Sequence, residues 1–360
     1  AGQWRGDGGG DQIESDDPTS AYTDATVSAG NCYQYIYEVF DYVSNGFNYT
    51  SGNSIMINNK PTLDQPTITP SFPNRVSNLT CEWNNVADIN GDDVVNITNW
   101  YKNGESFTVL NMPFEGLSGN EENNATDYSG YGNNGTVIGA TYNRTGGIVG
   151  GAYEFDGVDD YINLRESQWD GSLMNHTIIV WVNWIGKGPS SYDTIISKGG
   201  GEAAGFQYTI WEGGGGLGNV QFVMDSVIRT ASTQLTPSNG WHSLAVSLDE
   251  SNIIFYLDGV YDGSYTHNYG GDNNFDLNIG RKGIATPDYY FNGTIDEVKL
   301  FNHSLSPEQI RAEYQAGLAG MSSSQLSHNE TSYGDEWTCE VFVNDGYEEG
   351  GNSTADAVTI

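Results

Sequence analysis

The chain has 360 residues, in which 47 Asp and Glu stand against only 13 Lys and Arg, giving a formal charge of −34. A field of that sign repels nucleic acids and anionic membrane surfaces, so neither is expected as a partner. The sequence contains no apolar run long enough to span a bilayer, so no membrane insertion is expected. The length predicts two or three domains, and because the chain begins at Ala1 rather than Met, we expect a mature or excised form of a longer product.

The composition favours an all-β protein. Hydrophobic residues make up only 37% of the chain, but 23 Tyr, 13 Phe and 9 Trp supply large buried areas of the kind that fill β-sandwiches. The acidic residues are spread along the chain instead of forming one tail, which indicates a solvated surface with sites for hard cations such as calcium.

The first 58 residues are expected to form a partial β-sandwich module with a flexible N-terminal arm. Residues 1–20 are rich in Gly and Asp without periodicity, which predicts an irregular arm or a single irregular strand. From residue 21 apolar and polar residues alternate, and Asn45-Gly46 predicts a hairpin turn. The hairpin resembles the last strands of fibronectin type III or immunoglobulin-like modules, whose earlier strands are missing here.

Residues 59–107 resemble the first part of an immunoglobulin-like domain. Cys81 lies in one alternating segment and Trp100 in a later one, which ends at the turn Asn103-Gly104. The second cysteine of such a core comes only at Cys339, so residues 321–360 resemble the remainder of the same domain. The resemblance implies a disulfide between Cys81 and Cys339 and a second domain inserted at a surface turn.

The intervening residues carry a set of motifs that are specific in combination. These are a turn cluster at 127–136, two short strands around an Asp-Gly turn at 153–161, Trp241-His242, Tyr256-Leu257-Asp258-Gly259, and residues 293–298 and 305–310. Together they resemble laminin-G-like domains of the concanavalin A-like lectin/glucanase superfamily, and we assign residues 108–320 to this domain. The expected fold is all-β: a concanavalin A-like jelly-roll sandwich inserted in an immunoglobulin-like β-sandwich, preceded by a partial immunoglobulin or fibronectin III-like β module.

Within this insert, residues 176–184 read as a central strand, 241–248 and 252–257 as a hairpin, and 291–301 as the closing strand. One helix is predicted over 306–316. Ser306 is its N-cap, Gln309 completes a capping box, and Gly317 ends it. We expect this helix to lie on a sheet edge.

Catalysis is the weaker interpretation of the acidic residues. Some glucanases of this fold carry alternating carboxylates on one strand, and Glu154, Asp156 and Asp159 come nearest to that spacing. Gly157 interrupts the strand directly after Asp156, however, and a turn explains the same residues. The five His and three Cys show no triad or zinc spacing, so no catalytic residue is assigned.

Calcium is the better-supported ligand. The sequence Asp88-Ile89-Asn90-Gly91-Asp92 places oxygen ligands at positions 1, 3 and 5 around a Gly, although position 12 of the loop is Asn99 instead of Glu. A solvated turn is the equal alternative. The laminin-G-like resemblance implies a second set at one rim of the sandwich: Asp127, Asn133 and Asp296.

Loop aromatics suggest carbohydrate binding. Trp169, Tyr192, Trp211, Tyr269 and Tyr289 lie in or beside Gly-rich segments, where sandwich proteins often present aromatic rings to ligands. Most aromatic residues of a sandwich belong to its core, so each of these is individually as well explained by packing.

Eleven Asn-x-Ser/Thr sequons favour a secreted glycoprotein. The predicted glycosylation sites are Asn48, Asn78, Asn96, Asn124, Asn134, Asn143, Asn175, Asn292, Asn302, Asn329 and Asn352.

These features predict a non-catalytic extracellular surface protein with a structural or adhesive role, first as a subunit or repeat of a filament or stalk. A carbohydrate-binding module of an adhesin is the alternative, and a glycoside hydrolase comes third. Cys32 has no obvious partner, and the hairpin after it lacks covering strands. We therefore expect head-to-tail strand addition between copies through residues 1–57.

Overall fold

The computed structural model describes residues 58–116, 121–165, 175–190, 192–199, 206–212, 215–224, 226–267, 275–283 and 289–360, and the backbone of six strands before residue 58. The chain forms two compact units. The first comprises Ala1–Lys60 with Asp88–Asp92, and the second comprises Pro61–Ala87 with Asp93–Ile360. No helix among the described residues is long and apolar enough to cross a membrane.

The first unit contains a four-stranded antiparallel sheet in the order β2-β1-β4-β5 and a separate pair β3-β6. Its strands are β1 (Gly2–Gly6), β2 (Gln12–Ser15), β3 (Cys32–Tyr33), β4 (Tyr35–Phe40), β5 (Gly46–Thr50) and β6 (Ile55–Met56). The predicted β4-β5 hairpin is confirmed. The prediction of an irregular arm over residues 1–20 is wrong, because β1 and β2 pair with each other and β1 pairs with β4. The Gly and Asp content concealed the two strands.

The second unit contains a smaller sandwich built from segments on both sides of the predicted insert. One sheet has the order β27-β8-β7, and the other has the order β10-β9-β28-β29, with β30 also paired to β28. Its strands are β7 (Thr67–Thr69), β8 (Leu79–Glu82), β9 (Val95–Lys102), β10 (Glu105–Ser106), β27 (Gln325–Leu326), β28 (Glu336–Asn344), β29 (Glu349–Thr354) and β30 (Val358–Thr359). The pairing of β9 with β28 is what a split domain requires. Its immunoglobulin-like class and the boundaries assigned to it stay predictions.

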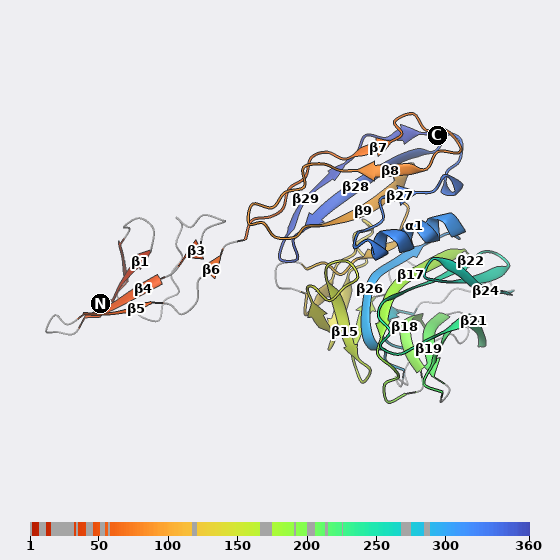
Figure 1. The fold of residues 1–360 in the computed structure, drawn as a ribbon, viewed down its shortest axis with the longest axis horizontal. Helices are drawn as coiled ribbons and strands as arrows, with labels where there is room; N and C mark the ends of the chain where they lie inside the picture. The colour runs from red at the N-terminus through yellow and green to blue at the C-terminus, as the bar shows by residue number, and fades with distance from the viewer. Residues whose placement is uncertain are drawn as a thin grey trace. The chain divides into compact units, whose positions relative to one another are not determined.

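A larger sandwich of two antiparallel sheets lies between these segments in the chain (Figure 1). The first sheet comprises β14 (Thr141–Asn143), β15 (Ala152–Asp156), β26 (Asn292–Phe301), β17 (His176–Trp184), β22 (His242–Leu248), β23 (Asn252–Leu257) and β24 (Val260–Thr266), with β11 (Leu110–Met112) also paired to β26. The second comprises β12 (Asn124–Ala125), β13 (Gly135–Ile138), β16 (Tyr161–Leu164), β25 (Leu277–Ile279), β18 (Tyr192–Lys198), β19 (Phe206–Glu212), β20 (Gly218–Met224) and β21 (Val227–Leu235). The predicted central strand, hairpin and closing strand are confirmed.

The two strands around the Asp-Gly turn do not form a hairpin. β15 pairs with β14 and β26 in the first sheet, whereas β16 pairs with β13 and β25 in the second. Gly157, with φ of +76°, takes the chain from one sheet to the other. This connection is therefore a corner of the sandwich, and the alternation on both sides of it does not reveal which strands pair.

The helix α1 (Pro307–Leu318) is confirmed, with Ser306 as N-cap accepting from the Gln309 amide, and it is followed by a short 3₁₀ helix, η1 (His328–Glu330). Two details of the prediction are wrong. The backbone N–H of Ser306 donates to Glu330 instead of Gln309, and the chain leaves the helix at Gly320, with φ of +70°, instead of Gly317. Gly317 is needed for contact, because a Cβ there would meet the Trp181 ring at 2.6 Å.

The helix packs on a sheet face and not on an edge. Tyr314 stacks on Trp181 of the central strand β17, with ring centroids 5.5 Å apart. One hydrophobic core joins Ile310 of the helix to the smaller sandwich and to the outer face of the larger sandwich, where it includes Ile179 and Phe301. A second core fills the interior of the larger sandwich. The helix therefore belongs to the contact between the two sandwiches.

Candidate functional site

Four connections between the two sheets of the larger sandwich lie at the same end of it. They join β15 to β16, β17 to β18, β21 to β22 and β25 to β26. The register places Asp156 opposite Asn292 and Tyr192 opposite Trp211 at this end. We call the described residues 156–160, 185–190, 215–217, 236–241, 280–283 and 289–291 the rim. Loops at the end of a rigid sandwich are a common place for binding residues.

Three of the five predicted loop aromatics come together at the rim, to which Tyr289 belongs. Tyr192 and Trp211 are cross-strand neighbours with ring centroids 6.3 Å apart, and Tyr289 lies 4.8 Å from Tyr192. The ammonium group of Lys282 is 5.2 Å from the centroid of Tyr289. The three rings are half-buried, and burial together with the nearby Tyr289 raises the pKa of Tyr192. We call these three residues the aromatic cluster. Trp169 and Tyr269 lie outside the described residues.

Two amide side chains extend the aromatic cluster along the sheet. Asn219 donates from Nδ2 to the backbone oxygen of Trp211 at 3.1 Å, and Gln234 donates from Nε2 to Asn219 Oδ1 at 2.9 Å. Both were missed in the sequence, because their position beside Trp211 depends on the register of β19, β20 and β21. The result is a row of aromatic and amide groups across the sheet.

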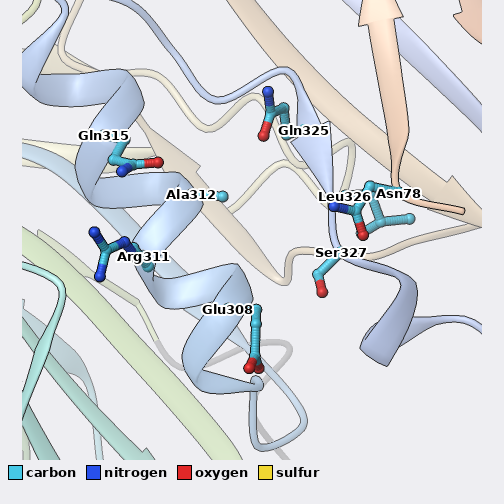
Figure 2. Close-up of a pocket in the computed structure, with 8 residues that line it drawn as sticks. All are labelled: Asn78, Glu308, Arg311, Ala312, Gln315, Gln325, Leu326 and Ser327. Carbon is cyan, nitrogen blue, oxygen red and sulfur yellow. The ribbon is translucent and has the colours of Figure 1, made fainter. Parts of the chain in front are cut away.

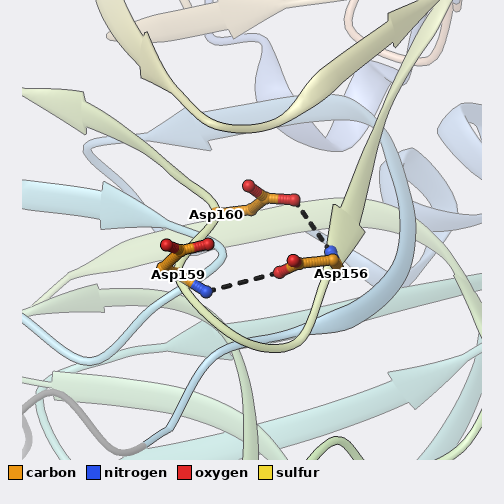
Figure 3. A group of neighbouring side chains, drawn as sticks. All are labelled: Asp156, Asp159 and Asp160. Carbon is orange, nitrogen blue, oxygen red and sulfur yellow. Dashed lines mark hydrogen bonds between the residues drawn. The ribbon is translucent and has the colours of Figure 1, made fainter.

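The corner between β15 and β16 is an acidic turn (Figure 3). Asp156 Oδ1 accepts from the amides of Val158 and Asp159, at 2.7 and 3.3 Å, and Asp160 Oδ2 accepts from the Asp156 amide at 2.9 Å. This confirms the turn interpretation of these carboxylates. Glu154, the remaining residue of the catalytic hypothesis, is exposed and accepts from Asn143.

One carboxylate oxygen from each of Asp156, Asp159 and Asp160 lies within 4.8 Å of the others. Burial raises the pKa of Asp160, and the charges of Asp156 and Asp159 raise it further. Grouped carboxylates are the ligands that calcium prefers, so the residues fit this ion. The sequence spacing suggested Asp156 and Asp159 for catalysis, and it singled out none of the three acids for calcium.

Residues 156–311 match the laminin G model of the concanavalin A-like lectin/glucanases superfamily. This part of the chain is a laminin-G-like domain. The resemblance inferred from the sequence motifs is thereby confirmed over residues 156–311, and the bounds 108–320 assigned to the domain stay a prediction.

The chain is similar to several solved structures. One is domain 4 of the extracellular arabinanase AbnA from Geobacillus stearothermophilus, in complex with arabinotriose, with 20% identity and a TM-score of 0.42; the match covers 56% of this chain and 98% of that chain. The receptor binding domain of botulinum neurotoxin D has 16% identity over 58% of this chain and 52% of that chain, with a TM-score of 0.43. The heptameric SAP-like pentraxin of Limulus polyphemus has 11% identity over 51% of this chain and 94% of that chain, with a TM-score of 0.36. The present chain thus spans about half of the neurotoxin domain. No curated protein matches the chain.

Of the three residues predicted to bind calcium in the laminin-G-like domain, the structure joins Asp127 and Asn133 by a hydrogen bond, whereas Asp296 is bonded to other segments. Asp127 accepts from the amides of Asn111, Ser129 and Asn133 and from the Ser129 hydroxyl. Asp296 accepts from the amides of Ile148, Val149 and Glu297. These bonds account for the burial of both carboxyls without a cation. Calcium at Asp127, Asn133 and Asp296 stays a prediction.

The loop at Asp88 has the geometry of a turn. Asp88 Oδ1 accepts from the amides of Asn90 and Asp92, at 2.7 and 3.2 Å, while its Oδ2 is buried without a hydrogen-bond partner. Asn90 Oδ1 accepts from Asn59. Asn99 is buried in β9 and bonds to Ser106 and Thr108, so it is not the twelfth ligand of this loop. Calcium at Asp88, Asn90 and Asp92 stays a prediction.

The disulfide implied by the immunoglobulin-like resemblance is confirmed. Cys81 in β8 is bonded to Cys339 in β28 across the two sheets of the smaller sandwich, with Cα atoms 6.3 Å apart. Both sulfurs lie in the core that contains Trp100 and Trp337. The side chain of Cys32 is outside the described residues.

The sequons differ in how their amide nitrogens are used. Nδ2 of Asn143, Asn292, Asn329 and Asn352 donates a hydrogen bond to a protein oxygen. Within the described part of the chain, four sequon asparagines are exposed with no hydrogen bond from Nδ2: Asn78, Asn134, Asn175 and Asn302. Asn96 and Asn124 are half-buried, and the side chain of Asn48 is not described. Occupancy stays a prediction, with the exposed group favoured.

A cavity of about 190 Å³ separates helix α1 from the smaller sandwich at Asn78 (Figure 2). It is lined by Glu308, Arg311, Ala312 and Gln315 of the helix and by Asn78, Gln325, Leu326 and Ser327. The side chain of Gln309 donates from Nε2 to the backbone oxygen of Gln325 and accepts at Oε1 from the Ser327 amide, which links the helix to the smaller sandwich. The cavity is small, with polar and apolar groups in its lining, and it lies between the helix and the smaller sandwich.

A buried carboxyl behind the aromatic cluster makes stability depend on pH. Asp193 accepts from the Gly188 amide and from Trp184 Nε1, both at 3.1 Å, and burial raises its pKa to about 7 in spite of these donors. The pKa of this carboxyl in the unfolded chain is about 3.9. Protonation of Asp193 therefore contributes to the free energy of unfolding. This contribution is fully present below about pH 3.9 and is lost as the pH rises through 7.

The free energy of unfolding of the unaltered protein is expected to fall between pH 5 and pH 8, and Asp193→Asn should reduce this fall by roughly 2 kcal/mol. Urea unfolding at both pH values measures this. Asp249→Asn is the control, because hydrogen bonds from Asn252 and Ser251 outweigh burial and lower the pKa of Asp249, so that it titrates below this window. An unchanged slope in Asp193→Asn would contradict the assignment.

Proposed function

We propose that the protein is an extracellular surface protein whose laminin-G-like domain binds carbohydrate through the aromatic cluster. The observation that carries this proposal is the convergence of Tyr192, Trp211 and Tyr289 beside Asn219 and Gln234. Aromatic rings offer apolar faces to the C–H groups of a sugar, while amides bond its hydroxyls. The match of residues 156–311 to the concanavalin A-like lectin/glucanases superfamily supports a binding role for this part of the chain.

Calcium is proposed as a structural ion at the acidic turn. A Cβ at Gly157 would lie 3.2 Å from Gly188 Cα, so the turn touches the loop that leads into Tyr192. Gly188 in turn donates to Asp193, next to Tyr192. An ion held by Asp156, Asp159 and Asp160 would order this loop and thereby the aromatic cluster.

The extracellular location is supported by the Cys81–Cys339 disulfide and by the sequons, because disulfides persist in oxidising compartments. The filament role, ranked first from the sequence, now has less support than glycan binding. It rested on a hairpin without covering strands. β1 extends that hairpin within its sheet but covers neither face, so this argument is unchanged, whereas the aromatic cluster adds support for glycan binding. Head-to-tail association stays a proposal.

The test is binding to an oligosaccharide array. Trp211→Ala is expected to weaken binding about tenfold or more, since truncating an aromatic residue that dominates a binding site typically costs about 2 kcal/mol or more. Tyr261→Ala is the matched control, because Tyr261 is 60% exposed on β24, outside the aromatic cluster. Chelation with EDTA tests the calcium proposal in the same assay. Binding that survives Trp211→Ala unchanged would overturn the glycan proposal.

A further inference from the structure

Two sheets in this chain each contain four strands with the same order and hairpin connections. The sheet of the first unit has the order β2-β1-β4-β5, and the disulfide-bearing sheet of the smaller sandwich has the order β10-β9-β28-β29. In each, one hairpin supplies the first two strands, a second hairpin supplies the last two, and all pairings are antiparallel.

The registers of the two sheets also coincide. The central pairs are Gln3↔Glu38 and Trp4↔Tyr37 in the first sheet, and Asn99↔Glu340 and Trp100↔Cys339 in the second. A Trp therefore occupies the same position in both, and Glu-Val-Phe occurs at 38–40 and again at 340–342. Agreement of strand order, register and these residues marks the two sheets as copies of one motif. In the second copy the laminin-G-like domain lies between the two hairpins.

The second copy shows what covers one face of this motif. Trp337, Cys339 and Val341 alternate along β28 on the buried face, where the core includes Ile68 of β7 and Leu79 and Cys81 of β8. Alternation along β4 places Tyr35, Tyr37 and Val39 on one face, and register adds Trp4. Among the strands described in the first unit, only the short β3-β6 pair lies outside the four-stranded sheet.

We propose that the Tyr37 face of the β2-β1-β4-β5 sheet is a docking surface for a two-stranded antiparallel segment with the sequence pattern of residues 67–82. The positions equivalent to Trp337, Cys339 and Val341 are Tyr35, Tyr37 and Val39, which are all apolar or aromatic. In the second copy the equivalent face packs against residues of β7 and β8. Tyr35, Tyr37 and Val39 are therefore of the residue type that packs against these two strands. The register also fixes the contact: Tyr37 occupies the place of Cys339, opposite the position of Cys81.

The test uses this register. The full chain carrying Cys32→Ser and Tyr37→Cys is mixed with a peptide of residues 61–87 in a glutathione redox buffer. We expect a mixed disulfide between position 37 and Cys81 of the peptide, found by non-reducing peptide mapping. Glu38→Cys in the same background is the matched control, because residue 38 lies on the opposite face. We expect at least tenfold less coupling there.

Hydrogen exchange of the unaltered chain gives a second measurement that needs no substitution. Excess peptide should slow amide exchange in residues 35–40, and a peptide carrying Leu79→Asp should not. Equal coupling at positions 37 and 38, or no protection by the peptide, would overturn the proposal. Protection that grows with chain concentration without peptide would instead identify a second copy of the chain as the occupant and refute the proposed one.

Discussion

Replacing Cys81 and Cys339 together by alanine is expected to lower the free energy of unfolding of the smaller sandwich by about 3 to 5 kcal/mol. The bond closes a loop with a sequence separation of 258, which restrains the unfolded chain strongly in the entropy model. The lower end applies if the laminin-G-like domain stays folded when the smaller sandwich opens, since a folded insert keeps the loop ends close. Urea unfolding followed by tryptophan fluorescence measures the change, because Trp100 and Trp337 lie in the same core.

Cys32→Ser is the control for this measurement, since Cys32 belongs to the first unit and its loss should leave the transition in place. A midpoint unchanged by the double substitution, or recovery of Cys81 and Cys339 as free thiols in the native protein, would contradict the prediction.

Lys299→Met is expected to cost about 3 to 5 kcal/mol, because it leaves buried carboxylates without their cation. Lys299 Nζ lies 3.1 Å from Glu297 Oε2 in β26 and 3.0 Å from Glu313 Oε2 in α1, and all three side chains are at most 10% exposed. Burial by itself lowers the pKa of Lys299, but Glu313 and Glu297 reverse this and raise it, so the lysine is charged. Burial and the negative charge of Glu297 raise the pKa of Glu115, which favours its neutral form.

The matched variant combines Lys299→Met with Glu297→Gln and Glu313→Gln. Because it removes the carboxylates together with the cation, it should recover most of the lost stability. The single and the triple variant are compared in urea unfolding curves. A single substitution that shifts the unfolding free energy by less than about 1 kcal/mol would show that the three charges do not depend on one another.

The features that could be predicted from the sequence depend on local patterns. The strands of 176–184 and 252–257 alternate or are continuously apolar, and Ser306 with Pro307 marks a helix start. The segments and side chains that these elements contact in the fold could be predicted less well from the sequence. Gln309 has the spacing of a capping box, but its side chain bonds across to the Ser327 amide, a contact made only after the chain returns to the helix. The strands of residues 1–20 were missed because their Gly and Asp content is typical of loops.

The candidate site divides in the same way. Aromatic residues in Gly-rich segments identified Tyr192, Trp211 and Tyr289, but only the register of β18 and β19 and the return of the chain before β26 bring them together. The acidic turn was visible as a turn, whereas the distance between its carboxylates depends on how the corner folds between two sheets. Asp193 gave no signal, because its raised pKa comes from burial by distant segments.

The Cys81–Cys339 bond also sets the path that tension applied along the chain would take. Tension applied between residues 61 and 360 follows the shortest covalent path, which runs through β8, across the disulfide and out along β28. The laminin-G-like domain lies wholly within the loop that this bond closes. Tension along the chain is therefore not transmitted through the laminin-G-like domain. A ligand bound at the aromatic cluster would be held by a domain whose strands carry none of this tension.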